Sequence, residues 1–240
     1  MLHWLAIYPD RVKASLLIEG FRDGFPLPAF TGIGCQPVKN LKSVDRFPEV
    51  VRGKILKEVR EGRVAGPFAS PPFVNFRISP LGIVPKKEPN AYRLIHHLPF
   101  PAGSSLNDDI DTSLSSVSYS TFEDAIKVIR RLGQGALLAK ADIKAAFRLL
   151  PIATFSFNSL GFCFEDKYFF DMCLPMGCSL SCAYFESFAS FLQWVVSFES
   201  GLDYIVITWT TVSSSGRQVP RHVCSCCSFF QKYRLILIFP

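Results

Sequence analysis

The stretch LLAKADIKAAFRLLPI, residues 137–152, decides the fold because it sets one carboxylate into a largely apolar run. Its first residues are typical of a buried strand, and Asp142 stands where that strand would end. A strand-end aspartate often caps the next turn. It is also a suitable ligand for a hard cation such as Mg²⁺, which prefers oxygen. Taken alone, the motif favours the capping interpretation, and a metal site requires partners elsewhere in the chain.

Helices and strands alternate irregularly around this stretch, without internal repeats. Apolar residues spaced four apart predict an amphipathic helix over residues 47–63 that ends at Gly62. A proline-rich connector follows at residues 66–76. The remaining patterns predict strands at 81–85 and 92–98 joined by a polar turn, a helix from a capping box at 120–123 to Gly133, two aromatic strands around Glu165 and Asp166, and a long helix over 179–201.

Composition limits the class of protein. The 240 residues are 49% hydrophobic, which is enough for a packed core, and the formal charge of +6 suits a polyanionic partner such as nucleic acid. Eight cysteines lack a metal-ligand spacing, no secretory leader opens the chain, and no apolar run reaches the length of a membrane span. We therefore expect an intracellular protein, in the cytoplasm or nucleus, that is not secreted.

Three segments together resemble the reverse transcriptase domain of retroelements, most closely that of retrotransposons encoding a tyrosine recombinase. They are EVREGRVAGPFASPPFVNFRISPLGIVPKKEPNAYRLIHHL at 58–98, LLAKADIKAAFRLLPI at 137–152 and CLPMGCSLSCAYFESF at 173–188. The segments follow the family order. The resemblance covers roughly residues 47–203 and implies an α+β fingers-and-palm polymerase fragment, with an antiparallel palm sheet and packed helices.

The resemblance assigns the metal and sugar contacts to the central segment. Asp142 matches the first catalytic, metal-binding carboxylate, and the backbone carbonyl of Ile143 would bind the same Mg²⁺ ion. Two such ions stabilise the attacking and leaving oxygens in nucleotidyl transfer. Phe147 matches the aromatic residue that rejects a ribose 2′-hydroxyl, although it also fits an ordinary core position.

Further nucleotide contacts are implied on either side. Arg93 and one of Lys86 or Lys87 match the triphosphate-binding pair, and both side-chain types suit phosphate oxygens. Lysines in an exposed turn are also commonly just solvated. The nucleotide-facing turn matches Pro175, Met176 and Gly177. His97 stands where many relatives carry aspartate, which leaves any hydrogen-bonding role there in doubt. The aromatic residues of the following long helix are expected to form core.

The resemblance also requires a Tyr-x-Asp-Asp hairpin, and this chain reads YIVITWTTVSSSG at residues 204–216 instead. No acidic residue follows Asp203, whereas about four are expected in a stretch of that length at the usual frequency. Hydroxyl groups and a tryptophan bring no negative charge for Mg²⁺. Cys224, Cys226 and Cys227 crowd the same region without a zinc-ligand spacing. The predicted metal site therefore lacks ligands.

The genetic code suggests a reason for the loss. The last base of the Trp209 codon and the first two of Thr210 spell GAC, an aspartate codon, and the next straddling codon also permits aspartate. Residues 207–211 can therefore conceal Tyr-Leu-Asp-Asp in the neighbouring frame. We accordingly predict a frameshift near residue 206. The expected organisation is an unassigned leader at 1–46, the polymerase region at 47–205 and an out-of-frame tail at 206–240. A divergent tail is the alternative.

The expected function is RNA-directed DNA synthesis by a retrotransposon protein, lost in this product. Its partners would be an RNA template, a DNA primer and a deoxynucleoside triphosphate, with recombinase and ribonuclease H domains elsewhere in the element. One alternative is a non-catalytic remnant that binds nucleic acid through its basic hairpin. Another is a relic that aggregates through exposed apolar surface. Solubility separates these two alternatives.

Overall fold

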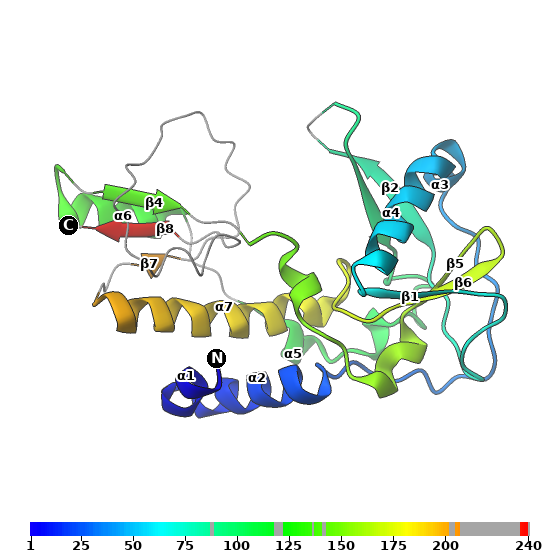
Figure 1. The fold of residues 1–240 in the computed structure, drawn as a ribbon, viewed down its shortest axis with the longest axis horizontal. Helices are drawn as coiled ribbons and strands as arrows, with labels where there is room; N and C mark the ends of the chain where they lie inside the picture. The colour runs from blue at the N-terminus through cyan, green and yellow to red at the C-terminus, as the bar shows by residue number, and fades with distance from the viewer. Residues whose placement is uncertain are drawn as a thin grey trace. The chain divides into compact units, whose positions relative to one another are not determined.

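The computed structural model describes residues 1–86, 89–117, 122–135, 137–140, 143–201, 205–206 and 236–239 (Figure 1). The chain divides into two compact units. The first unit comprises residues 1–17, 117–146 and 186–240, and the second comprises residues 18–116 and 147–185. Helices α2 (Arg11–Asp23) and α7 (Ser179–Ser200) contribute residues to both units.

The first unit combines helices with a small antiparallel sheet of strand order β4-β8-β7. These strands are β4 (Leu137–Lys140), β8 (Ile236–Phe239) and β7 (Ile205–Val206). Its helices are α1 (Leu2–Ile7), α6 (Phe122–Leu132) and parts of α2 and α7. Aromatic rings join α1 to α7, with the centroids of Trp4 and Trp194 6.4 Å apart. Ring packing of this kind holds the amino-terminal helix against the long one.

The second unit contains the segments that the sequence analysis marks for nucleotide binding, apart from Asp142 and Ile143. Strands β1 (Val64–Phe68), β6 (Lys167–Asp171) and β5 (Gly161–Phe164) form an antiparallel sheet in that order, and β2 (Leu81–Pro85) pairs with β3 (Tyr92–His96) as a hairpin. The helical elements are α3 (Lys42–Arg46), α4 (Pro48–Arg60), α5 (Thr112–Ser115), and the 3₁₀ turns η1 (Asn107–Asp109), η2 (Ala146–Leu149) and η3 (Thr154–Ser159).

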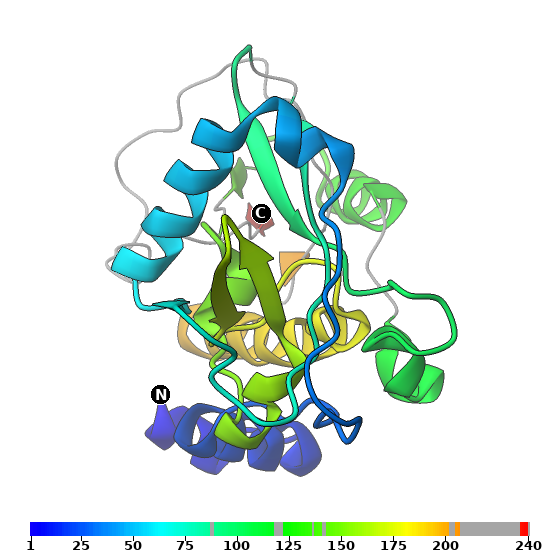
Figure 2. The same ribbon diagram turned by 90° about the vertical axis from the view of Figure 1, so that its right-hand side faces the viewer.

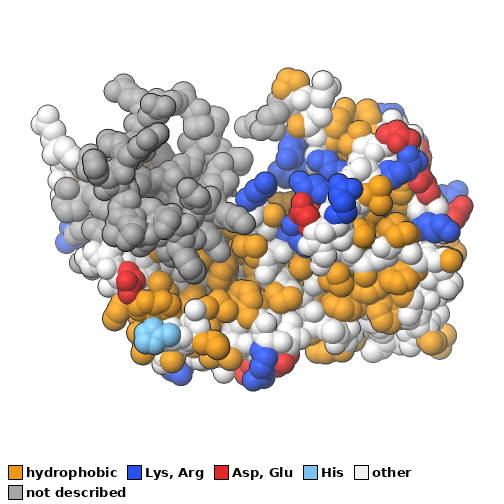
Figure 3. All heavy atoms as spheres, viewed as in Figure 1, with side chains coloured by type: hydrophobic (Ala, Val, Ile, Leu, Met, Phe, Trp, Pro, Cys, Tyr) orange, Lys and Arg blue, Asp and Glu red, His pale blue; other side chains and the backbone are white. Residues whose placement is uncertain are grey.

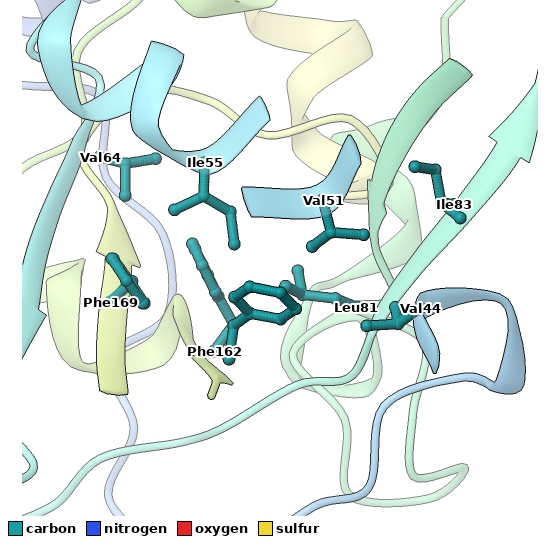
Figure 4. Packing of buried hydrophobic residues seen from close by; sticks show 9 residues of the cluster. Val44, Val51, Ile55, Val64, Leu81, Ile83, Phe162 and Phe169 are labelled. Atoms are coloured by element: carbon teal, nitrogen blue, oxygen red, sulfur yellow. The ribbon is translucent and has the colours of Figure 1, made fainter. Parts of the chain in front are cut away.

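Helix α4 closes the core of the second unit. Pro48 occupies its first turn, where the missing N–H costs nothing, and the helix gives way at Gly62, whose φ of +68° suits a residue without a side chain. Val51 and Ile55 project from one face into a cluster with Phe162 and Phe169 (Figure 4). Viewed from the side, α4 lies across the hairpin and the β5–β6 pair (Figure 2). Burial of this apolar face joins the hairpin to the sheet.

The turn between β5 and β6 follows directly from two residues. Glu165 and Asp166 have φ values of 51° and 54°, the left-handed conformation that a two-residue hairpin turn requires. Such turns match the right-handed twist of the strands that they join. Arg52 of α4 forms an ion pair with Glu165 across the surface. The aromatic strands are therefore paired in the register Phe162 with Phe169.

The predicted mixture of helices and antiparallel strands is confirmed. The hairpin and the β5–β6 strands form where the patterns place them, and the predicted helices at 47–63 and 179–201 appear as α4 and α7. Along α7, Phe185, Phe188 and Phe191 are buried, as expected of core residues. The capping-box residues Ser120 and Thr121 lie outside the described residues.

Two features differ from the sequence-based expectation. The proline-rich connector at 66–76 begins inside a strand, because β1 continues through Phe68 and pairs with β6. A register shift between Ala65 and Phe68 lets the strand pass Pro67, which cannot donate a backbone hydrogen bond. Residues 1–46, in which no motif was identified, contain α1, α2 and α3. Over the described ranges, none of the helices has the length and apolar character needed to span a membrane.

Candidate nucleotide-binding and metal-binding residues

The basic hairpin positions two of the predicted triphosphate contacts. Arg93 lies opposite Val84 in the β2–β3 ladder, and the Lys86 N–H donates to the carbonyl of Ala91 at 2.7 Å where the turn begins. Both basic residues are exposed. Lys and Arg side chains gather on the part of the second unit that contains α4 and the hairpin (Figure 3). Lys87 lies outside the described residues, and the role of each side chain stays a prediction.

The predicted catalytic carboxylate belongs to a residue that the structure does not describe. Asp142 lies outside the described residues, whereas strand β4 ends at Lys140 and Ile143 is described and half-buried. Ala145 has a φ of 56°, a left-handed conformation that is uncommon for a residue with a Cβ. This turn separates the predicted metal contacts from η2. The expected binding of Mg²⁺ by Asp142 and Ile143 therefore stays untested.

Phe147 is the first residue after this turn that belongs to the second unit. Its ring lies 5.7 Å from that of Phe185 on α7, in an edge-to-face arrangement with an interplanar angle of 76°. The side chain is half-buried. Aromatic packing of this geometry stabilises a core, and it also fixes the orientation of a ring that borders a binding site. Both interpretations of Phe147 fit its surroundings.

The turn at 175–177 packs closely against the end of the hairpin. Pro175 is buried, Met176 is 49% exposed, and Gly177 adopts a φ of +107°. A Cβ at Gly177 would lie 2.9 Å from the carbonyl oxygen of His96, which leaves no room for a larger residue. Asn107 fixes the turn from the other side, because its amide donates to the carbonyl of Gly177 at 2.9 Å.

A charge network of two buried and three half-buried residues connects these segments; the buried members are Asp171 and His96, and the half-buried ones are Arg148, Glu58 and Arg63. Arg148 is its centre, and 15% of its side chain is exposed. Its Nη2 lies 2.7 Å from Oδ1 of Asp171, and its Nε donates to Oε2 of Glu58 at 3.1 Å. The same guanidinium donates to the backbone carbonyls of Cys173 and Arg63 at 3.0 and 3.2 Å. The sequence analysis identified none of these charged residues as functional.

His96 extends the network into the hairpin. Its Nδ1 lies 2.9 Å from Oδ2 of Asp171, and its Nε2 lies 3.1 Å from the carbonyl oxygen of Gly161. Both partners are acceptors while Asp171 is ionised, so the ring makes both hydrogen bonds only when both nitrogens carry hydrogen. The ring is 6% exposed. The neighbouring His97 instead stacks on Phe100, with ring centroids 6.3 Å apart.

The network holds its two acidic members in the ionised form. Burial by itself raises the pKa of Asp171, but the charge of Arg148 and the hydrogen bond from His96 outweigh it, so the pKa lies below the ordinary value. Burial also opposes ionisation of Glu58, whose pKa is nevertheless lowered by Arg63 and Arg148. The native state therefore resists protonation of both carboxylates.

Acid is expected to destabilise the second unit through these two groups. Because both pKa values are lower in the folded protein, their contribution is fully present above the unfolded-state values, about 4, and is lost as pH falls through the folded-state values. Urea denaturation at pH 7, 4 and 3 should therefore show stability falling mainly below about pH 4. In the Asp171→Asn variant, the free energy of unfolding should fall less between pH 4 and pH 3 than in the wild-type protein. An equal fall in that variant would contradict the role given to Asp171 in acid destabilisation.

Within the described part of the chain, no three His, Cys, Asp or Glu side chains are grouped so as to hold a metal ion. Asp142 and residues 207–235 lie outside the described residues. The sequence supplies no acidic residue after Asp203. One carboxylate and one backbone carbonyl do not match the donor set that a pair of Mg²⁺ ions requires.

Comparison with known proteins shows the fold alone. No protein-family model and no curated protein matches the chain. Among solved structures, the foamy viral protease-reverse transcriptase in complex with an RNA/DNA hybrid has a TM-score of 0.50 and 17% identity over 86% of this chain. A mutant of the prototype foamy virus protease-reverse transcriptase gives a TM-score of 0.46 with 16% identity over the same share. The chain spans 27% of the length of each. The fold is thus reverse-transcriptase-like.

Proposed function

We propose that the chain is a fingers-and-palm fragment of a retrotransposon RNA-directed DNA polymerase, of the type found with a tyrosine recombinase. The observation that carries the proposal is the meeting, in one compact unit, of three segments that the sequence resemblance assigns to the nucleotide. The hairpin with Arg93, the turn after Phe147 and the turn at Gly177 contact one another or share the Arg148 network. The likeness of fold to reverse transcriptases supports the same conclusion.

In this proposal, the intact enzyme would join the primer 3′-hydroxyl to the α-phosphorus of an incoming deoxynucleoside triphosphate and release pyrophosphate, and two Mg²⁺ ions would supply charge stabilisation. Asp142 and the carbonyl of Ile143 would hold one ion. Lys86 or Lys87 and Arg93 bind the triphosphate, whereas Phe147 excludes a 2′-hydroxyl. The turn of Pro175, Met176 and Gly177 lies against the nucleotide. Template and primer are held mainly through their phosphates.

The product encoded here lacks the remaining carboxylates, and we infer that it does not polymerise. A frameshift near residue 206 accounts for the loss, because the neighbouring frame permits Tyr-Leu-Asp-Asp across residues 207–211. In this proposal, residues 47–205 are the polymerase region and residues 206–240 are an out-of-frame tail, whereas residues 1–46 are an unassigned leader. Recombinase and ribonuclease H domains belong to the rest of the element.

A second candidate function is binding of nucleic acid without catalysis, favoured by the exposure of Lys86 and Arg93 on the hairpin. A protein that retains the phosphate contacts but lacks the metal site would bind a template–primer duplex without extending it. Affinity would then fall steeply with salt, because each phosphate contact releases counterions.

Primer extension and duplex binding test both candidates. With an RNA template, a DNA primer, deoxynucleotides and Mg²⁺, the purified protein is expected to give no extension but salt-dependent binding. Binding should survive Asp142→Ala and weaken in Arg93→Ala, while Arg22→Ala, which removes an exposed arginine beside Asp23, serves as the matched control. Extension by the protein as encoded would contradict the inferred loss of activity. Absence of duplex binding would contradict both functions.

A further inference from the structure

Arg148 adjoins Phe147, contacts the run that leads into Gly177, and reaches the hairpin through Asp171 and His96. We propose that Arg148, Asp171 and His96 form a positioning network that fixes these segments relative to one another. In this proposal, the network acts through the three segments that it joins. Its functional meaning rests on the proposed function, whereas its mechanical role rests on the contacts alone.

The first link joins the turn after Phe147 to the run that leads into Gly177. Arg148 follows Phe147 directly, and its Nη1 donates to the carbonyl of Cys173 at 3.0 Å. One backbone bond runs in parallel with this contact, because the N–H of Leu174 donates to the carbonyl of Leu150 at 3.0 Å. Within the turn itself, the N–H of Leu150 donates to the carbonyl of Phe147 at 3.1 Å. A shift of either segment therefore breaks a buried charge-assisted bond.

The second link joins the hairpin to the same run. Asp171 accepts from Arg148 through one oxygen and faces His96 through the other, so the carboxylate connects β6 with β3. Arg93 lies three residues before His96 on that strand. Gly177 then packs directly on the His96 backbone, where an added Cβ would lie 2.9 Å from the carbonyl oxygen. The Gly177 turn is thus in direct contact with the base of the hairpin.

The shape of the guanidinium makes this arrangement specific. Four acceptors surround Arg148 in different directions, namely Glu58, Asp171 and the carbonyls of Cys173 and Arg63. A planar fork with fixed donors satisfies such a set, whereas a lysine ammonium is a single point of charge and cannot reach all four. Burial strengthens each bond and makes an unfilled acceptor costly.

Arg148→Lys tests the network, with Arg52→Lys as the matched control. Arg52 also pairs with two carboxylates, those of Glu49 and Glu165, but it belongs neither to the charge network nor to the three segments. We expect Arg148→Lys to accelerate hydrogen exchange at the Leu150, Leu174 and His97 amides by about tenfold more than at Phe76, which bonds to Gly34 in a separate loop. Arg52→Lys should leave this pattern unchanged. Equal acceleration at Phe76, or a matching response in both variants, would overturn the network.

A second measurement connects the network to the nucleotide. Binding of a fluorescent deoxynucleoside triphosphate should weaken by about tenfold in Arg148→Lys and stay within twofold in Arg52→Lys. Equal affinity in both variants would overturn the positioning role. Failure of the wild-type chain to bind the triphosphate would contradict the proposed function instead, and the exchange pattern would still decide whether the network fixes the three segments.

Discussion

Replacing Arg148 with methionine is expected to lower the free energy of unfolding by about 3–5 kcal/mol, the range found when one partner of a buried ion pair is removed. The substitution leaves the buried Asp171 carboxylate without its main counter-charge and removes donors from the carbonyls of Cys173 and Arg63. Methionine has a similar length, so loss of packing contributes little. Urea denaturation followed by circular dichroism measures the change.

The control for this prediction is an exposed arginine. Arg22 pairs with Asp23 at 2.6 Å, but 67% of its side chain is exposed, so Arg22→Met should leave the unfolding curve almost unchanged. The loss expected for Arg148→Met is a substantial part of the free energy of unfolding of an ordinary domain. If Arg148→Met instead folds with a stability close to that of the control, the described network does not hold the unit together.

Restoring the neighbouring reading frame beyond residue 206 is expected to convert an inactive product into a magnesium-dependent polymerase. The restored chain would regain two carboxylates beside Asp142, which completes the donor set that a pair of Mg²⁺ ions needs. Primer extension on an RNA template measures the gain. Within the restored chain, Asp142→Asn should reduce the rate by about a thousandfold or more, as expected from loss of several kcal/mol of charge stabilisation.

The matched control for the restored chain is Asp108→Asn. Asp108 is an acidic residue whose carboxylate binds Ser105 within its own loop and is assigned no role in the metal site. Its replacement should leave extension near the level of the restored chain. An equal loss of extension in Asp108→Asn and Asp142→Asn would contradict the two-metal interpretation of Asp142.

Much of the fold was predictable because the deciding signals are local. Glycines at 62, 133 and 201 end helices and adopt positive φ values, and the paired acidic residues at 165–166 define a hairpin turn. Apolar spacing along α4 correctly predicts the face that Val51 and Ile55 bury. Helix α2 escaped prediction although its end signals are present: Asp10 accepts from the Lys13 N–H at its start, and Gly24, with a φ of +93°, follows its last residue. Strand β1 escaped because its partner β6 lies about a hundred residues away in sequence.

The charge network could not be predicted from the sequence for a related reason. Its members come from five separate segments, and sequence gives no measure of which buried charges meet. A signal was nonetheless present: Arg148 and Asp171 each interrupt an otherwise apolar run, and opposite charges in such places must find partners when buried. Asp142 shares this pattern, but its predicted partners are absent from the encoded chain.

The DNA sequence across the codons for residues 204–216 tests the central claim most directly. If the chain descends from a polymerase whose reading frame was broken, the neighbouring frame encodes Tyr-x-Asp-Asp followed by an apolar strand. The Trp209 and Thr210 codons already fix one aspartate there. A neighbouring frame without the second aspartate, or one interrupted by a stop codon at this position, would contradict the account.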